Sequence, residues 1–187
     1  MVIVVVEYDL SWPRRFEALR DEYADAMAAA GVTVTAIEHV GSTAVPGLAA
    51  KPVIDCDIVV AEPAVMAASQ TLVALGFTPL GELGIPWRWA FKAPERLAGT
   101  NTYVVVEGSL SLRNHLAVRT VLRADPDLRR QYETVKRRLA AVTDDIDEYG
   151  QGKSAVIQRI LATAGLTDAE LSSIDANQVP SHVERPR

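Results

Sequence analysis

The pattern of apolar and polar residues divides the chain into a first part with strands and a second part without them. Apolar residues at three- and four-residue spacing predict a helix over 11–30, which begins at Ser11 and ends at Gly31, and a second helix over 63–75. Apolar or alternating runs predict five strands, over 2–6, 32–40, 53–60, 87–92 and 100–107. The stretch 41–52 is rich in glycine, proline and small residues, which is typical of a loop.

The second part of the chain keeps a helical pattern from residue 109 onward. Apolar residues recur at helical spacing in three segments, 112–122, 132–142 and 156–161. Strands with intervening helices, followed by helices alone, predict an α+β fold: a mixed β-sheet with flanking helices and a helical C-terminal subdomain. We expect one domain over 1–166, divided at about residue 108 into a sheet part and a helical part, and a polar C-terminal tail over 167–187.

Composition and charge narrow the class of protein. Of the 187 residues, 49% are hydrophobic and 23% charged, as in a globular protein rather than a disordered one. The net charge of -5 argues against a general nucleic-acid binder, so nucleic acid is not an expected partner. The apolar run 2–6 is too short for a membrane span, which needs about 20 residues, and lacks the basic lead-in of a signal peptide. We therefore expect a cytoplasmic protein with no membrane partner, and the sequence does not indicate its oligomeric state.

Two aspartates inside an apolar predicted strand carry the strongest chemical signal. Asp55 and Asp57 are two residues apart, so their side chains point to the same face of the sheet. Carboxylates are costly in an apolar strand unless a positive charge compensates them, and a pair on one face can share a divalent cation such as Mg²⁺ or Mn²⁺. The preceding turn Gly41-Ser42-Thr43 offers backbone N–H groups and hydroxyls suited to a phosphate. Lys51 is near enough in sequence to be a further phosphate partner.

This combination is what the transfer of a nucleotidyl group needs. A metal held by Asp55 and Asp57 would neutralise a nucleoside triphosphate and orient it for in-line attack. The loop would hold the triphosphate in position. A simpler interpretation stays open, in which both aspartates lie at a strand end and only cap neighbouring backbone groups. Cys56 lies between them and points to the opposite face, where we expect core packing. As the single cysteine, it cannot form an internal disulfide.

The loop and strand resemble the GrpB family of the nucleotidyltransferase superfamily. The run Glu-His-Val-Gly-Ser-Thr-Ala-Val-Pro-Gly-Leu over 38–48, then Ala-Lys-Pro and the strand with two aspartates, match that family almost residue for residue. The resemblance extends from about residue 5 to residue 164. It implies a metal-dependent nucleotidyltransferase that moves a nucleotidyl group, AMP from ATP, to a small-molecule acceptor such as an amino acid or another metabolite.

On a later strand the chain departs from the family pattern. Nucleotidyltransferases usually have a third carboxylate there, and GrpB-like proteins tend to show His-x-Leu-His-Val-Val, whose histidines are replaced here by Asn101 and Val104. Glu107 is the best remaining third carboxylate for the metal and for catalysis, because Tyr103, Val105 and Glu107 alternate onto one face. An interpretation of Glu107 as a solvent-facing strand-end residue is equally open.

Several basic residues are candidates for binding the nucleotide phosphates. His39 precedes the Gly-Ser turn, and a buried structural histidine is the alternative interpretation. Arg88 and Lys92 lie on one face of a predicted strand, with solvated cations as the alternative. Lys153 lies near the start of the last helix, where its charge is unfavourable to the helix dipole, which suggests a role elsewhere.

A charged stripe on one predicted helix is either a solvated face or a face turned toward a phosphate-binding cleft. Its members are His115, Arg119 and Arg123.

A second function class stays open, a non-catalytic nucleotide-binding or accessory, chaperone-like module. Domains of this family are also found fused to dephospho-CoA kinase, which makes an accessory role reasonable. The kinase activity itself is not implied, because the chain has no Gly-x-x-x-x-Gly-Lys-Ser/Thr loop. The position of Glu107 discriminates: a carboxylate facing Asp55 and Asp57 favours catalysis, and one facing solvent favours the accessory module.

Overall fold

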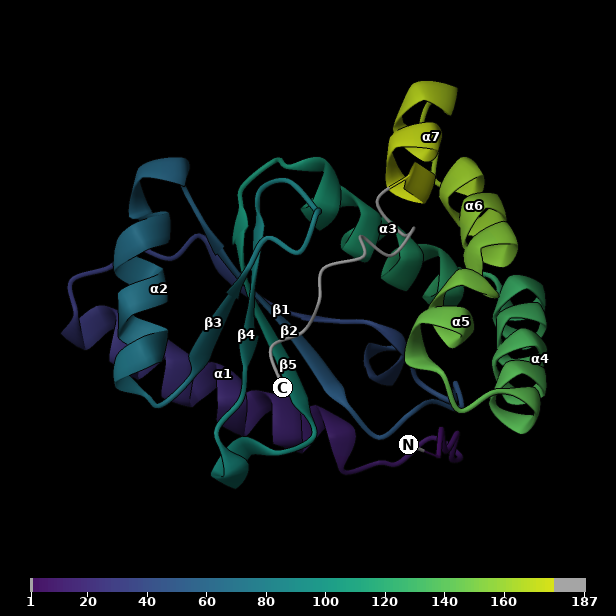
Figure 1. Cartoon of the computed structure of the whole chain (residues 1–187), viewed down its shortest axis with the longest axis horizontal. Coiled ribbons are helices and arrows are strands. Elements are labelled where there is room, and N and C mark those ends of the chain that lie inside the picture. Colours follow the sequence, from purple (N-terminus) through teal and green to yellow (C-terminus); the bar gives the residue numbers. More distant parts are fainter. Residues whose placement is uncertain (1, 177–187) are drawn as a thin grey trace.

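The computed structural model describes residues 2–176 and shows a five-stranded mixed sheet (Figure 1). The strand order is β1-β2-β5-β4-β3. All neighbours pair antiparallel except β2 and β5, which are parallel. This arrangement confirms the predicted mixed sheet. The strands are β1 (Ala36–Val40), β2 (Ile54–Val60), β3 (Thr78–Gly81), β4 (Arg88–Lys92) and β5 (Thr100–Val106).

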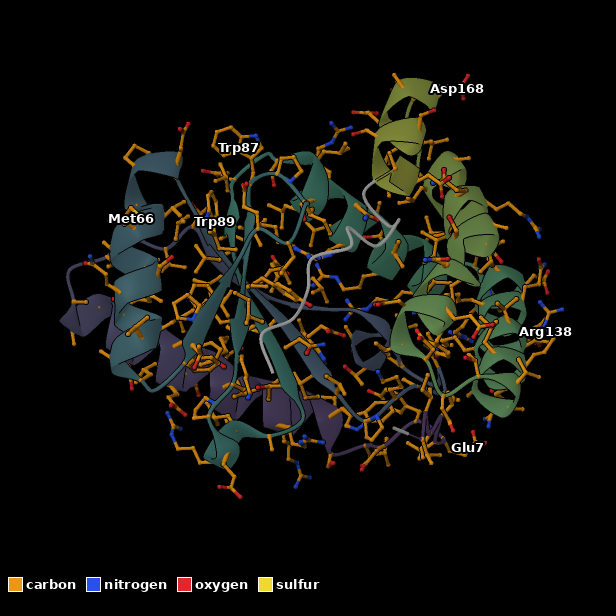
Figure 2. The ribbon with its side chains drawn as sticks, in the orientation of Figure 1. Glu7, Met66, Trp87, Trp89, Arg138 and Asp168 are labelled. Carbon is orange, nitrogen blue, oxygen red and sulfur yellow. The ribbon has the colours of Figure 1, made fainter. Side chains whose placement is uncertain are left out.

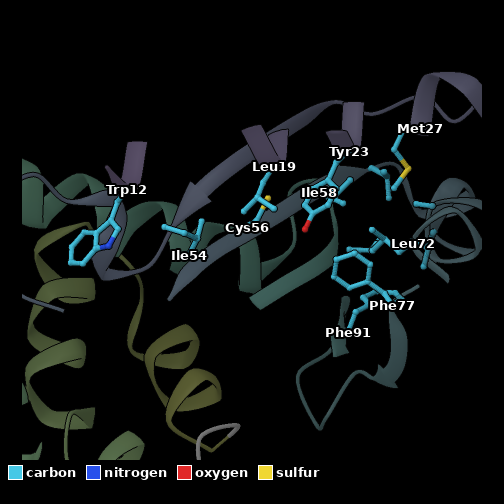
Figure 3. Packing of buried hydrophobic residues seen from close by; sticks show 14 of the residues in the cluster. Trp12, Leu19, Tyr23, Met27, Ile54, Cys56, Ile58, Leu72, Phe77 and Phe91 are labelled. Atoms are coloured by element: carbon cyan, nitrogen blue, oxygen red, sulfur yellow. The ribbon is translucent and has the colours of Figure 1, made fainter. Parts of the chain in front are cut away.

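Helices α1 (Trp12–Ala29) and α2 (Val65–Ala74) cover one face of the sheet (Figure 1). Residues of α1 point toward β2 across a core that includes Tyr23, Cys56 and Ile58 (Figure 3). Cys56 is fully buried there, which confirms its predicted packing role. Because strand side chains alternate, Asp55 and Asp57 must point to the other face.

The other face of the sheet meets the helical part through α3 (Leu110–Ala124), with Leu112 packed on Val59 and Val105. The remaining helices lie to one side of the sheet (Figure 1). They are α4 (Pro126–Val142), α5 (Ile146–Gln151), α6 (Ser154–Thr163) and α7 (Asp168–Ala176). Three short 3₁₀ turns complete the described chain: η1 (Ser42–Ala44), η2 (Glu62–Ala64) and η3 (Glu95–Leu97). Among the described residues, no helix is long and apolar enough to cross a membrane.

Besides α5, a helix of six residues that the sequence pattern did not indicate, three elements differ from the sequence expectation. Residues 2–6 do not form a sheet strand; Val6 makes only an isolated bridge with Ala50. Strand β3 went unpredicted because Pro79 and Gly81 interrupt its pattern. The expected tail begins with a helix, α7, because Ile174 is buried and Glu170 pairs with Arg113 of α3 at 2.6 Å. The rest of that predicted tail, 177–187, lies outside the described residues.

Candidate active site

The two aspartates of β2 lie on the face that α3 covers, as predicted from the strand period. Asp57 is fully buried, and its Oδ2 lies 2.7 Å from Nδ1 of His115 on α3. A carboxylate only accepts hydrogen bonds, so the imidazole donates through Nδ1. Burial alone would lower the pKa of His115, but the charge and hydrogen bond of Asp57 outweigh it and raise that pKa. The second oxygen of Asp57, Oδ1, is buried without a hydrogen-bond partner.

Asp55 lies beside a neighbouring strand and a glycine. Its Oδ1 accepts a hydrogen bond of 2.7 Å from Nδ2 of Asn101, its register partner on β5. Its Oδ2 faces Gly41 so closely that a Cβ on that glycine would lie 2.2 Å from the oxygen. Burial raises the pKa of Asp55, and the Asn101 hydrogen bond only partly offsets it. The fold therefore holds the Asp55 carboxylate where its surroundings only partly stabilise the negatively charged form.

These two carboxylates fit a magnesium site. Mg²⁺ is commonly bound by one or two carboxylates, with water and substrate phosphate oxygens filling the other positions. Asp57 Oδ1 is a buried acceptor without a donor, which is the state expected of a ligand awaiting a cation. In the part of the chain that the structure describes, no group of three His, Cys, Asp or Glu side chains is placed to hold a metal.

The structure shows that Glu107 is not the third carboxylate of this site. The β2–β5 register pairs Asp57 with Tyr103, so Glu107 lies four residues further along, about 13 Å away at strand spacing. Glu107 follows the end of β5, and its Oε2 accepts a hydrogen bond of 3.3 Å from Thr35 in an exposed setting. The prediction failed because strand parity specifies a face and not a distance along it.

We expect Glu107→Gln to leave ATP binding within about twofold of the parent, because this carboxylate lies about 13 Å along the sheet from Asp57 and makes one exposed hydrogen bond. Isothermal titration calorimetry with ATP and magnesium measures it. A loss of affinity as large as that caused by changing Asp55 would contradict the position given to Glu107 here.

Three lysines line a cavity of about 480 Å³ that also reaches Ser42 and Asp55. Lys51 comes from the loop before β2, Lys136 from α4 and Lys153 from the residue before α6. Burial lowers the pKa of all three; for Lys51 and Lys136 the charge of Lys153 adds to the effect. Crowded, partly buried cations of this kind are suited to an anion with several charges.

Tyrosines support this lysine cluster. The ammonium group of Lys153 lies 4.5 Å from the ring centroid of Tyr149, and that of Lys51 lies 6.0 Å from it. Lys136, only 2% exposed, lies 4.7 Å from the ring centroid of Tyr132 and donates to the Ala49 carbonyl. Cation–π contacts hold the charges without neutralising them, so they remain available to a ligand.

The Gly-Ser turn becomes the 3₁₀ turn η1, whose N-cap residue Gly41 has φ of 71°. Ser42 and Thr43 line the lysine cavity, but the Thr43 hydroxyl is committed to structure because it donates to the Val53 carbonyl at 3.0 Å. The predicted phosphate contact of Thr43 is therefore left to its backbone N–H, since the first N–H groups of a helical turn have no partner within it.

His39 does not reach the cavity, contrary to the prediction. It lies on the opposite face of β1, stacked on Phe16 with ring centroids 4.6 Å apart, and its Nε2 is 3.0 Å from the Thr43 hydroxyl. Because that hydroxyl already donates to Val53, His39 donates through Nε2. Burial, followed by the charges of Arg123 and Arg119, lowers the pKa of His39 to about 4. It is a neutral structural histidine that holds the loop.

The two basic residues of β4 are separated by the structure. Arg88 lines the lysine cavity and its guanidinium lies 4.7 Å from the ring centroid of Tyr103. Lys92 pairs with Thr78 of the edge strand, is exposed, and is not among the described residues that line the cavity. The prediction that both meet a phosphate is therefore wrong for Lys92.

The charged stripe of α3 is neither solvated nor directed at a phosphate. Arg119 donates to Glu38 and to the His39 carbonyl, both at 2.7 Å. Arg123 donates to the Ala44 carbonyl at 3.0 and 2.6 Å. With His115 bound to Asp57, the stripe fixes α3 to β1, β2 and η1.

Sequence reasoning missed Lys136, Asn101 and Tyr149 as site residues. A lysine four residues after Tyr132 on a buried helical stripe was a usable signal for Lys136, because cations rarely occupy such a stripe without a role. Asn101 was noted only as a departure from the family pattern. Tyr149 lines the cavity from α5, a helix of six residues that is too short to show a periodic pattern of apolar residues.

The lysine cluster predicts that stability rises with pH. The pKa of Lys136, lowered to about 7 by burial and then by the charge of Lys153, lies below its ordinary value of 10.5. Between these values the unfolded chain binds more protons than the folded one, so the free energy of unfolding rises with pH. We expect Tm to rise by roughly 5 °C between about pH 7 and pH 9, and Lys136→Met to remove most of that rise.

The control for this measurement is Lys92→Met, which removes an exposed lysine and should keep the rise of the parent. Differential scanning calorimetry of the three proteins over the same pH series measures it. Parallel curves for the parent and Lys136→Met would show that Lys136 is not the titrating group.

Comparison with known proteins supports the same family and fold. The family model described as GrpB protein matches residues 2–163. The UPF0157 protein YqkA of Bacillus subtilis is 33% identical over 158 residues, which are 83% of this chain and 45% of YqkA. The chain thus spans less than half the length of that relative.

Solved structures agree with the relatives. The crystal structure of the conserved protein GrpB from Enterococcus faecalis matches with a TM-score of 0.75 and 30% identity, over 86% of this chain and 96% of that one. The structure of the GLD-2/RNP-8 complex matches with a TM-score of 0.54 and 14% identity, over 89% and 64% of the two chains. At that identity the second match shows the fold alone.

Proposed function

The chain belongs to the GrpB family and has a nucleotidyltransferase-like fold, and from this premise we propose that it is a metal-dependent nucleotidyltransferase. The reaction is the transfer of a nucleotidyl group, AMP from ATP, to a small-molecule acceptor. The observation that carries the proposal is the buried, unpartnered Oδ1 of Asp57 on the same face as Asp55, next to the cavity of three lysines.

The charges of the site divide into two groups with separate roles. Lys51, Lys136 and Lys153 offer positive charge to the phosphates of ATP, and the turn at Ser42 offers backbone N–H groups. Asp55 and Asp57 would hold Mg²⁺, which supplies charge neutralisation at the reacting phosphate when it is bound. Neither group is fully satisfied by the protein alone. The lysines are crowded by like charge, burial raises the pKa of Asp55, and Oδ1 of Asp57 lacks a hydrogen-bond partner.

Arg88 and His115 have supporting roles. His115 donates to Asp57 and so fixes the orientation of that carboxylate, leaving Oδ1 for the metal. Arg88 lies between the sheet and the cavity, where its charge faces the same space as the lysines. These contacts hold the site in place before any substrate arrives, which lowers the cost of organising it during the reaction.

Calorimetric titration of the whole chain with ATP, with and without magnesium, tests the proposal, together with a pyrophosphate-release assay on a pool of small metabolites. We expect binding only with magnesium, and pyrophosphate release only when an acceptor is present. Equal ATP affinity with and without magnesium would remove the metal from the proposal.

The position of Glu107 favours a second candidate, a nucleotide-binding or accessory module without turnover. The residue beside Asp55 on β5 is Asn101, which carries no charge and cannot act as a general base. The two candidates differ in one result. The accessory module binds ATP with magnesium and releases no pyrophosphate with any acceptor, whereas the enzyme releases it with at least one.

A further inference from the structure

A second cavity, of about 360 Å³ and called here the apolar cavity, adjoins the lysine cavity and shares Ile85 and Arg88 with it. It lies between β4 and the helices α3, α6 and α7. Trp87, labelled in Figure 2 just before β4, forms part of its wall. Its size is near the lower end of the range for small-molecule sites, about 300–1,000 Å³. The two aspartates are not part of its lining, but Gly41 and His115, which lie against them, are.

The walls of this cavity are mostly apolar and carry no acidic side chain. The apolar residues besides Ile85 are Pro86, Trp87, Leu110, Val118, Ile157 and Ile174. The polar ones are Arg88, Ser111, Asn114, His115 and Ser173. Since none of the described lining residues is Asp or Glu, a ligand cation such as the ammonium group of a free amino acid would meet no acidic side chain in these walls.

Two buried polar atoms in the lining of this cavity have no hydrogen-bond partner. Four buried side-chain polar atoms in the described part of the chain lack a hydrogen-bond partner. They are Trp12 Nε1, Asp57 Oδ1, Arg88 Nε and Ser111 Oγ. Two of them, on Arg88 and Ser111, belong to the lining of the apolar cavity, and Ser111 is only 6% exposed. Both can donate a hydrogen bond and neither has an acceptor, which a ligand oxygen would supply.

The neighbourhood of the aspartates restricts the attacking group of the acceptor. Asn101 and Tyr103 are the β5 residues paired with Asp55 and Asp57, and neither is a carboxylate. His115 is bound to Asp57 through Nδ1. A hydroxyl or an ammonium group must lose a proton in order to attack, whereas a carboxylate is already an anionic nucleophile at neutral pH.

We propose that the apolar cavity binds the acceptor, and that this acceptor is a carboxylic acid with an uncharged, apolar body. The inference rests on the proposed nucleotidyl transfer and specifies its substrate class. Arg88 and Ser111 donate to the carboxylate, and the apolar walls enclose the body. The free amino acid expected from the sequence fits less well, because the described lining offers its ammonium group no acidic side chain.

The proposed transfer of AMP to the carboxylate needs no general base. One carboxylate oxygen forms a bond to the α-phosphorus of ATP while the bond between the α-phosphorus and the bridging oxygen to the β-phosphate breaks. The electron pair of that bond leaves with pyrophosphate. The product is an acyl-adenylate, a mixed anhydride, and no proton is taken from the acceptor.

Three probes with the same ring and chain test the preference for a carboxylate: 3-phenylpropionate, L-phenylalanine and 3-phenylpropan-1-ol. Calorimetric titration of the nucleotide-free protein measures each. We expect 3-phenylpropionate to bind at least about tenfold more tightly than the alcohol, since a hydrogen bond to a charged group contributes that much. We also expect it to bind more tightly than phenylalanine, whose ammonium group meets no acidic side chain in the described lining. With ATP and magnesium, we expect it alone to give pyrophosphate and an anhydride that hydroxylamine traps as the hydroxamate.

Ser111→Ala is the variant of choice, because Ser111 lines the apolar cavity and is not part of the lysine cavity. We expect it to weaken 3-phenylpropionate binding about tenfold and to leave ATP binding within about twofold. The matched control, Thr120→Ala, removes an exposed hydroxyl from the same helix and should change neither.

The other possible results separate a failure of this inference from a failure of the proposed function. Tighter binding of the alcohol overturns the carboxylate preference, and tighter binding of phenylalanine overturns the requirement for an uncharged body; both leave the proposed function intact. Competition between adenosine and 3-phenylpropionate assigns the cavity to the nucleobase and overturns the inference. Binding of 3-phenylpropionate without any ATP binding contradicts the nucleotidyltransferase and retains only a carboxylate site. Binding of ATP with none of the three probes shows that the cavity is not the acceptor site.

Discussion

Asp55→Asn is expected to abolish the magnesium dependence of ATP binding and to lower nucleotidyl transfer by roughly a thousandfold. The amide keeps the size of the side chain but removes one of two charges that would hold the cation. Asp57→Asn is expected to have the same effect on magnesium, because its unpartnered Oδ1 is the other proposed ligand atom. Calorimetry with and without magnesium, and pyrophosphate release, measure the two effects.

The two variants should differ in stability, which separates loss of a ligand from loss of the fold. The folded chain raises the pKa of Asp55 above its ordinary value of 3.8 through burial. Above that value the folded chain holds the proton more tightly than the unfolded one, so ionisation of Asp55 costs stability as pH rises through the raised pKa. At neutral pH, Asp55→Asn should therefore keep or raise the Tm of the metal-free protein.

Asp57→Asn should instead lower stability by about 1–3 kcal/mol, because it weakens the charge-assisted hydrogen bond from His115 to a fully buried partner. Urea unfolding of both variants measures the difference. Glu107→Gln serves as the control carboxylate outside the site. Magnesium-dependent ATP binding that survives in both aspartate variants would place the metal elsewhere.

Local sequence patterns predicted the parts of the site that lie close together in the chain. The two-residue strand period was enough to place Asp55 and Asp57 on one face, and the Gly-Ser turn at Gly41 does lie against Asp55. The same period placed Glu107 on that face without saying how far along the strand it lies. The β2–β5 register decides that distance, and the register depends on pairing between strands about 45 residues apart.

The residues that sequence patterns could not place reach the site through tertiary packing. His115 and Lys136 lie 58 and 87 residues from the groups that they bind, Asp57 and the Ala49 carbonyl. Their helices show an ordinary amphipathic pattern, which predicts a buried face but not what that face meets. A basic residue on such a face is therefore ambiguous until the packing of the helices is known.

Gly41→Ala is expected to remove magnesium-dependent ATP binding and to lower the free energy of unfolding by roughly 2–4 kcal/mol. Two causes add. Gly41 has φ of 71° and ψ of -170°, a backbone region that is essentially reserved for glycine. In addition, the new Cβ would lie 2.2 Å from Oδ2 of Asp55, so the carboxylate must move.

Gly47→Ala is the matched control that separates the two causes. Gly47 also has a positive φ, 75°, but a Cβ there would meet no atom within 4 Å. It should lose only the cost of a positive φ, about 1–2 kcal/mol, and keep its ATP binding. Loss of binding in Gly41→Ala alone would then come from the displaced carboxylate. Equal ATP binding in the two variants would show that the position of Asp55 does not matter. The comparison tests whether the absence of one Cβ at Gly41 is what lets the phosphate-binding turn and the metal-binding carboxylate meet at one point.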